Sequence, residues 1–174
     1  MVLAAYDSDG YKIVLVLHIL TVVVGLGAVM LNGLYGAQAK ARRGPEGLAI
    51  AEANFKVTKI AEYFIYAIPV FGIALVAMSD DRFTFEQTWI WLSILLYVVA
   101  LGISHGVMIP STKKMLVAMR EMAGGPPAGA PSTGGPPPQA AQLEALGKRL
   151  GTGGMVLNLI TVVIIVLMVW QPGV

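Results

Sequence analysis

Residues 13–31, which read IVLVLHILTVVVGLGAVML, decide how this chain folds. They include no Asp, Glu, Lys or Arg, and their one ionisable side chain is His18. About 20 apolar residues cross a 30 Å hydrocarbon core as a helix, so the stretch is typical of a membrane span. Three further apolar stretches follow at residues 60–78, 89–109 and 155–170, the last with a small-residue lead-in from Gly151.

The composition is also that of a protein dissolved in lipid. Of the 174 residues, 56% are hydrophobic and only 13% are charged, whereas about 25% charge is usual in soluble domains. The net charge of +2 is too small to indicate a nucleic-acid partner, and we expect none. The chain has no cysteine, no P-loop, no HExxH and no GxSxG, so we expect no catalytic chemistry of its own.

Helices are the only structure that these stretches can form in lipid, because each backbone amide must be satisfied within its own segment. The sequence therefore predicts an all-α fold, a four-transmembrane-helix bundle. We expect a single integral membrane domain over residues 1–174, with spans at about 12–38, 57–79, 88–110 and 151–170.

The basic residues predict the orientation of the bundle. Ten of the twelve Lys and Arg side chains fall in loops on one side: Lys40, Arg42, Arg43, Lys56, Lys59, Lys113, Lys114, Arg120, Lys148 and Arg149. Positive charge stays in the cytoplasm, which predicts an N-out/C-out arrangement in the plasma membrane of a bacterial-type cell. Trp89, Trp91 and Trp170 then fall at the outer interface, where an aromatic belt is expected.

Two cytoplasmic loops join the spans in this interpretation. The helix-forming centre of residues 40–56 suggests a short interfacial helix, and the stretch STKKMLVAMREM from Ser111 suggests an amphipathic helix along the membrane surface. Residues 123–141 form a Pro/Gly-rich tract that cannot bury enough surface to fold, so we expect a flexible, disordered linker. The alternative for this tract is a Pro-rich docking site.

Polar residues inside the spans are the candidates for function, because they are costly in hydrocarbon. Helix rise places His18 about 9 Å below the outer boundary and His105 about 21 Å below it. The same arithmetic places Glu62 about 24 Å and Asn158 about 18 Å below that boundary, with Tyr66 one turn from Glu62. We expect a polar cluster of Glu62, Tyr66, His105 and Asn158 near the cytoplasmic face, with His18 apart from it.

Each of these groups has two interpretations. A carboxylate beside an imidazole can relay a proton or bind a cation, or the cluster can simply hold helices together through hydrogen bonds. Because the two histidines are offset by about 12 Å along the membrane normal, one haem with both as axial ligands is disfavoured. A haem held by one histidine and a methionine or water stays open, with Met30, Met78, Met108, Met155 and Met168 as candidates. Gly102 and Gly106 frame His105 in a GxxxG pattern, which permits close helix packing.

Short motifs in all four spans resemble domain-of-unknown-function family 2269, a group of predicted bacterial integral membrane proteins with four helices. They are VLHILTVVVGLGAVML in the first span, Ile68-Pro69 with Gly72 in the second, GVMIPSTKKM in the third and LMVWQPG in the fourth. The resemblance covers roughly residues 11–120 and 150–173, and it implies a four-helix membrane fold without an assigned activity.

The Leu-His start of the first span is also similar to that of haem- and copper-associated membrane families, including the bacterial protoporphyrinogen oxidase and the copper-resistance D proteins. Those families place a tryptophan shortly before the glycine, where this chain has Val24 before Gly25. Only His18 carries over to their first-span histidine.

Three hypotheses follow for the function. The first is a small accessory or scaffold membrane component that binds the lipid bilayer and self-associates, or binds another membrane protein, through its small-residue faces. The second is a haem-binding membrane redox protein that uses His18 or His105. The third is a proton or cation pathway through Glu62 and His105.

Overall fold

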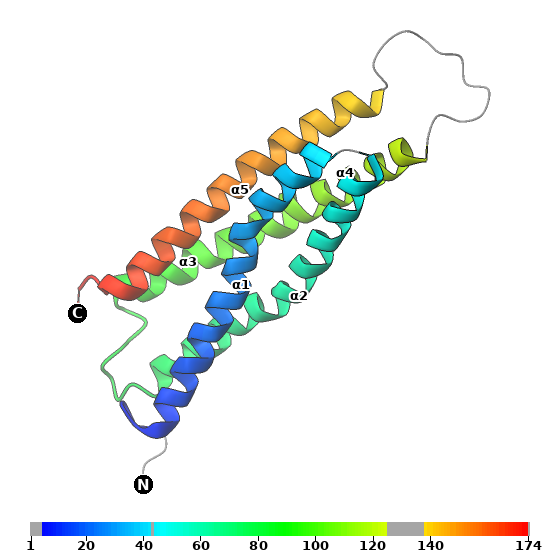
Figure 1. Ribbon diagram of the computed structural model, residues 1–174. Helices are drawn as coiled ribbons and strands as arrows, with labels where there is room; N and C mark the ends of the chain where they lie inside the picture. Colours follow the sequence, from blue (N-terminus) through cyan, green and yellow to red (C-terminus); the bar gives the residue numbers. More distant parts are fainter. Residues whose placement is uncertain (1–4, 43, 125–137, 174) are drawn as a thin grey trace, which may run out of the picture.

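The computed structural model describes residues 5–42, 44–124 and 138–173, and every regular element in these ranges is helical. The elements are α1 (Asp9–Arg42), α2 (Gly44–Ala77), α3 (Thr88–Ile103), a π-helical turn η1 (Ser104–Met108), α4 (Ile109–Ala123) and α5 (Pro138–Trp170). Since α3, η1 and α4 follow one another without a break, they act as one rod, and the fold is a four-helix bundle (Figure 1).

Each of the four rods is long and apolar enough to cross a membrane. Their most apolar windows have mean hydropathies of 2.7, 1.9, 2.1 and 2.4, and at most 17% of any such window is buried within the protein. Apolar side chains therefore cover the outside of the bundle as well as its interior, which is the pattern expected when lipid is the solvent. The predicted all-α, four-span fold is confirmed.

The chain threads back and forth so that both ends of the described chain lie at one end of the bundle, together with the α2–α3 connection (Figure 1). The α1–α2 turn lies at the opposite end, which we call the basic end because it carries Lys40, Arg42, Lys56, Lys113, Lys114, Arg120, Lys148 and Arg149. Helix α1 packs along α2, and α5 packs against α1, α3, η1 and α4.

At the basic end, the structure differs from the expected surface helices. Helices α1 and α2 continue to a tight turn at Gly44, whose φ of +52° suits glycine. A helix of 34 residues is about 51 Å long, well beyond the 30 Å that the hydrocarbon requires. Residues 40–42 and 44–56 are therefore helical extensions of α1 and α2 and not a loop with a separate interfacial helix.

These extensions pack on one another through a small apolar core. Ala39, Ala51 and Leu116 are buried, with exposed fractions of 7% or less. An ion pair of 2.8 Å between Arg120 Nε and Glu52 Oε1 joins α4 to α2 beside this core. In residues 111–122, Leu116 and Ala118 are buried within the protein, whereas Val117 and Met122 are exposed, so only part of the apolar face expected at the membrane surface meets neighbouring helices. The linker expected over residues 123–141 lies mostly outside the described residues, and residues 138–141 belong to α5.

The opposite end is closed by the α2–α3 connection. The hydroxyl of fully buried Ser79 donates to the Val76 carbonyl and accepts from the Phe83 amide. Phe83 packs edge-on against Trp89, with ring centroids 5.5 Å apart. Trp89 is consequently buried inside the protein, whereas Trp91 and Trp170 are exposed as an aromatic belt requires.

Candidate functional site

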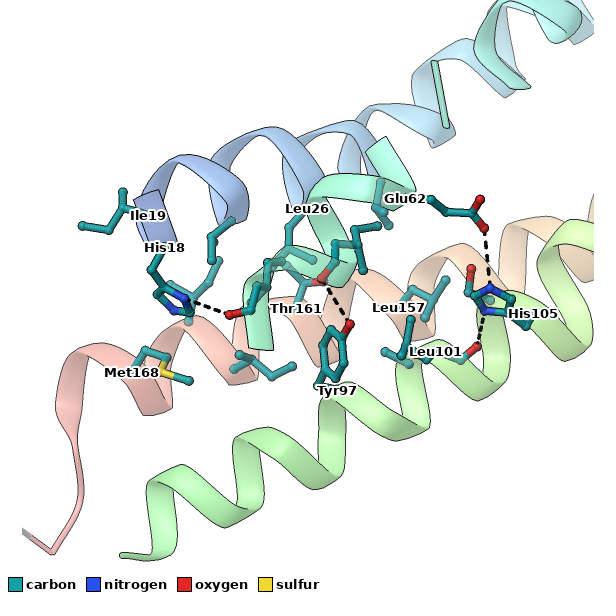
Figure 2. Close-up of a pocket in the computed structure, with 18 of the residues that line it drawn as sticks. His18, Ile19, Leu26, Glu62, Tyr97, Leu101, His105, Leu157, Thr161 and Met168 are labelled. Atoms are coloured by element: carbon teal, nitrogen blue, oxygen red, sulfur yellow. Dashed lines mark hydrogen bonds and ion pairs between the residues drawn. The ribbon is translucent and has the colours of Figure 1, made fainter. Parts of the chain in front are cut away.

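A partly open cavity of about 330 Å³ lies between the helices and is lined by residues of α1, α2, α3, η1 and α5 (Figure 2). Most of its lining is aliphatic. The polar side chains that reach it are His18, Glu62, Tyr97, Ser104, His105 and Thr161. His18 and His105 lie at opposite ends, so both histidines line one cavity although their depths differ. The sequence predicted that His18 lies apart from Glu62 and His105. The structure places His18 at the opposite end of the same cavity, and not in a separate one.

At one end, the His18 ring is fixed by a backbone hydrogen bond. Its Nδ1 lies 3.1 Å from the carbonyl oxygen of Ile68 on α2. A carbonyl only accepts, so Nδ1 carries the proton, and Nε2 of the neutral ring keeps its lone pair. In the described part of the chain, Nε2 has no hydrogen-bond partner. A Cβ at Gly72 would lie 3.2 Å from Cε1 of His18, so this glycine makes the space for the ring.

Pro69 shapes the middle of the cavity. Proline has no amide hydrogen, so the Ile65 carbonyl cannot receive the usual helical bond from position 69. The Tyr97 hydroxyl on α3 donates to this carbonyl at 3.1 Å. A Cβ at Gly25 would lie 3.1 Å from the Ile65 amide nitrogen, which shows how closely α1 approaches α2 at the same level.

At the other end, His105 sits in the π-helical turn η1. Pro110 follows this turn, and the Ile109 amide reaches back to Ser104 in the wider π-helical pattern. Nδ1 of His105 lies 3.0 Å from the Leu101 carbonyl, and Nε2 lies 2.7 Å from the Tyr66 hydroxyl. Both ring nitrogens of His105 are therefore engaged, unlike those of His18.

Glu62 is the buried carboxylate of the site, with an exposed fraction of 7%. One of its oxygens, Oε2, pairs with the Lys59 ammonium one turn away. The other, Oε1, lies 3.6 Å from Nε2 of His105 and is buried without a hydrogen-bond partner in the described structure. The structure thus brings Glu62, Tyr66 and His105 together.

Asn158 stands apart from this group. Its Oδ1 is buried, and no hydrogen bond within the described ranges joins it to the other three residues. Of the five candidate methionines, Met168 lines the cavity, on the α5 wall beside the His18 end (Figure 2). Met108 instead packs on Gly153, and Met155 is 68% exposed.

Sequence reasoning missed Tyr97 and the two carbonyls at Ile65 and Ile68. Pro69 was the available signal for Tyr97 and the Ile65 carbonyl, because a proline within a span exposes a carbonyl one turn earlier that a hydroxyl on a neighbouring helix can satisfy; no sequence signal marked the Ile68 carbonyl. Among residues 5–42, 44–124 and 138–173, no group of three or more His, Asp and Glu side chains is placed to hold a metal ion. A haem iron needs only one or two protein ligands.

Comparison with known proteins gives one result. A model of the family described as "Predicted integral membrane protein (DUF2269)" matches residues 12–172. No curated protein and no solved structure matches the chain. The matched range includes the first membrane-spanning rod from Lys12 onward, the other three rods in full and both ends of the cavity. The chain belongs to the DUF2269 family, whose members are predicted integral membrane proteins of unknown function.

Proposed function

We propose that the protein binds a haem in its intramembrane cavity, where Nε2 of His18 would hold the iron. The observation that carries the proposal is the hydrogen bond from Nδ1 of His18 to the Ile68 carbonyl. Metal-binding histidines almost always donate their other ring N–H to a carbonyl or carboxylate, because this bond fixes the tautomer and makes the ligating nitrogen more basic. His18 has this arrangement, and its free nitrogen belongs to a ring that lines the cavity.

The rest of the cavity supports the same proposal. Pockets for small molecules and cofactors span about 300–1,000 Å³ and are mostly apolar, and this cavity of about 330 Å³ lies within that range. The Met168 thioether on the α5 wall would supply a second ligand. His105 is a poorer one, because the Tyr66 hydroxyl already occupies its Nε2. A bound haem would supply one-electron or oxygen chemistry, and this chain would hold it away from water.

Absorbance spectroscopy tests the proposal. The protein is purified in detergent and titrated with haemin, and we expect one equivalent to give a Soret band. His18→Gly should abolish the band, and added imidazole should restore it by replacing the lost ligand. His105→Gln is the matched control and should keep the band. Gly72→Ala should weaken haem binding, because its new Cβ would displace the His18 ring.

Two results would overturn the haem proposal. One is wild-type protein that stays colourless after haemin titration. The other is a folded His18→Gly variant that binds haemin with an unchanged spectrum. Helicity measured by circular dichroism separates loss of the ligand from loss of the fold.

A second candidate function, an accessory component that self-associates, rests on the glycines of the third rod. A Cβ at Gly102 or Gly106 would meet no other atom within 4 Å, whereas one at Gly25 would be crowded. The GxxxG face therefore has space for a second helix from another protein molecule or from a membrane partner. Single-molecule photobleaching in liposomes should show dimers that Gly102→Leu disrupts and Gly27→Leu does not. Monomers at all protein-to-lipid ratios would exclude self-association through this face.

We also infer that both termini lie outside a bacterial-type plasma membrane, with the basic end in the cytoplasm. The support is the gathering of most Lys and Arg side chains at one end of the bundle. The natural chain has no cysteine, so single introduced cysteines can report the orientation. In intact cells, an impermeant maleimide should label Glu86→Cys and spare Glu46→Cys. The reverse pattern would invert the orientation.

A further inference from the structure

We propose that Glu62, Tyr66 and His105 form a site that binds and releases one proton at the basic end of the cavity. The proposal is independent of haem binding, because it concerns the end of the cavity away from His18. It rests on the placement of hydrogen-bond donors and acceptors around Nε2 of His105.

When His105 is neutral, one acceptor of the site, Glu62 Oε1, has no hydrogen-bond donor. Nδ1–H of His105 donates to the Leu101 carbonyl at 3.0 Å, so Nε2 must accept the Tyr66 O–H at 2.7 Å. Glu62 Oε1, 3.6 Å from the same nitrogen, then faces an acceptor and has no donor. A buried carboxylate oxygen without a donor is costly. The site therefore lacks one hydrogen.

One added proton on Nε2 of His105 removes this deficit. Nε2–H then donates toward Glu62 Oε1, and the Tyr66 hydroxyl turns so that its oxygen can accept. No covalent bond other than N–H forms, and no electron moves. The imidazolium would gain a carboxylate partner in a region of low dielectric constant, where opposite charges attract strongly.

The other charged and titratable groups near the site lie on α2 and α3. Lys59 already pairs with Glu62 Oε2, and Tyr63 is 76% exposed. Helix α3 contributes Tyr97, which donates to the Ile65 carbonyl. The residues of α5 that line the cavity are apolar except for Thr161, and the one titratable group that α1 adds to the lining is His18, at the far end. Lys59 therefore opposes proton binding, and Glu62 favours it.

Protons reach the site from the basic end. The Lys59 side chain is half exposed, that of His105 is 46% exposed, and that of Glu62 is 10% exposed, so exposure falls from Lys59 to the carboxylate. Beyond Glu62, the described lining is apolar for most of the way to His18. A proton can therefore enter and leave on one side of the bundle without crossing it.

Nitrogen NMR of histidine-labelled protein in lipid nanodiscs tests the site. The chain has two histidines, so His18→Gln leaves the His105 signals alone and serves as the reference. We expect His105 to bind one proton as pH falls. Adding Glu62→Gln should weaken proton binding, because the carboxylate charge beside the imidazolium is lost. Adding Tyr66→Phe should raise the affinity, because the donor that competes for Nε2 is lost.

Tyr63→Phe is the matched control and should leave the titration unchanged. The proposal would be wrong if Glu62→Gln and Tyr66→Phe shift the affinity of His105 in the same direction, or leave it unchanged. A proton flux across proteoliposomes that Glu62→Gln abolishes would also overturn it, because the site would then belong to a path through the bundle.

Discussion

The hydrogen bond from Tyr97 to the Ile65 carbonyl should stabilise the bundle only because residue 69 is proline. The bond is 3.1 Å long, and its acceptor is the carbonyl that Pro69 leaves without its usual helical donor. Tyr97→Phe removes the hydroxyl and leaves the ring. Pro69→Ala restores an amide hydrogen that can bond Ile65 within α2. The two substitutions together form a double-mutant cycle with a defined sign.

The expected size follows from known hydrogen bonds. Interhelical bonds in membrane proteins average about 0.6 kcal/mol and reach about 1.7 kcal/mol, and a backbone acceptor left bare inside a protein adds to the cost. We expect Tyr97→Phe to lower the free energy of unfolding by about 1 kcal/mol in the natural chain. In the Pro69→Ala background, the same change should cost about 0.3 kcal/mol or less, because the carbonyl then has a second donor.

Reversible unfolding in mixed micelles, followed by circular dichroism as the denaturing detergent increases, measures both costs. Tyr63→Phe is the control, since this tyrosine is 76% exposed on the same helix as Ile65 and should show no dependence on residue 69. Equal costs of Tyr97→Phe in the two backgrounds would refute the reasoning. Pro69 would then not be the reason that Tyr97 bonds to this carbonyl.

Three further substitutions test the packing. Gly25→Ala should destabilise the bundle by about 1 kcal/mol in the same unfolding assay, because its Cβ would crowd the α2 backbone, whereas Gly27→Ala, with open space around it, should be neutral or stabilising. Leu116→Ala should lower the free energy of unfolding by about 2–3 kcal/mol, since this side chain is 4% exposed. Val117→Ala, at the exposed neighbouring position, should lower it by less than about 0.5 kcal/mol. Equal effects would show that the helical extensions have no core of their own. Arg120→Ala should lower the free energy of unfolding by no more than about 1 kcal/mol, and by less in high salt, because its ion pair is exposed. A loss that does not depend on salt would contradict this prediction.

The sequence predicted the fold well because membrane spans depend on hydropathy alone. The four apolar stretches and the distribution of basic residues were enough to place both ends of the described chain at one end of the bundle. The helical extensions at residues 40–42 and 44–56, and the partly buried face of residues 111–122, differ from the prediction for a physical reason. An amphipathic pattern shows that a helix has an apolar face, but it does not show whether that face meets lipid or another helix.

The candidate site was predicted less completely. Depth along a helix follows from residue number, so the common level of Glu62, Tyr66 and His105 could be anticipated. Residue number alone does not show which way a side chain faces around the helix axis, or where the backbone carbonyls of a neighbouring helix lie. The sequence therefore gave no indication that His18 and His105 line one cavity, or that a carbonyl at Ile68 orients the first of them.

The length of the cavity has an electrical consequence. Helix rise separates His18 from Glu62 by about 15 Å along the membrane normal, which is about half of the 30 Å hydrocarbon thickness. Moving one elementary charge across a whole membrane is worth about 2.3 kcal/mol per 100 mV, so a charge at one end differs from a charge at the other by about 1.2 kcal/mol per 100 mV. An energised membrane would therefore favour a cation at the level of His18 over one at the level of Glu62, or the reverse, by about eightfold at that voltage.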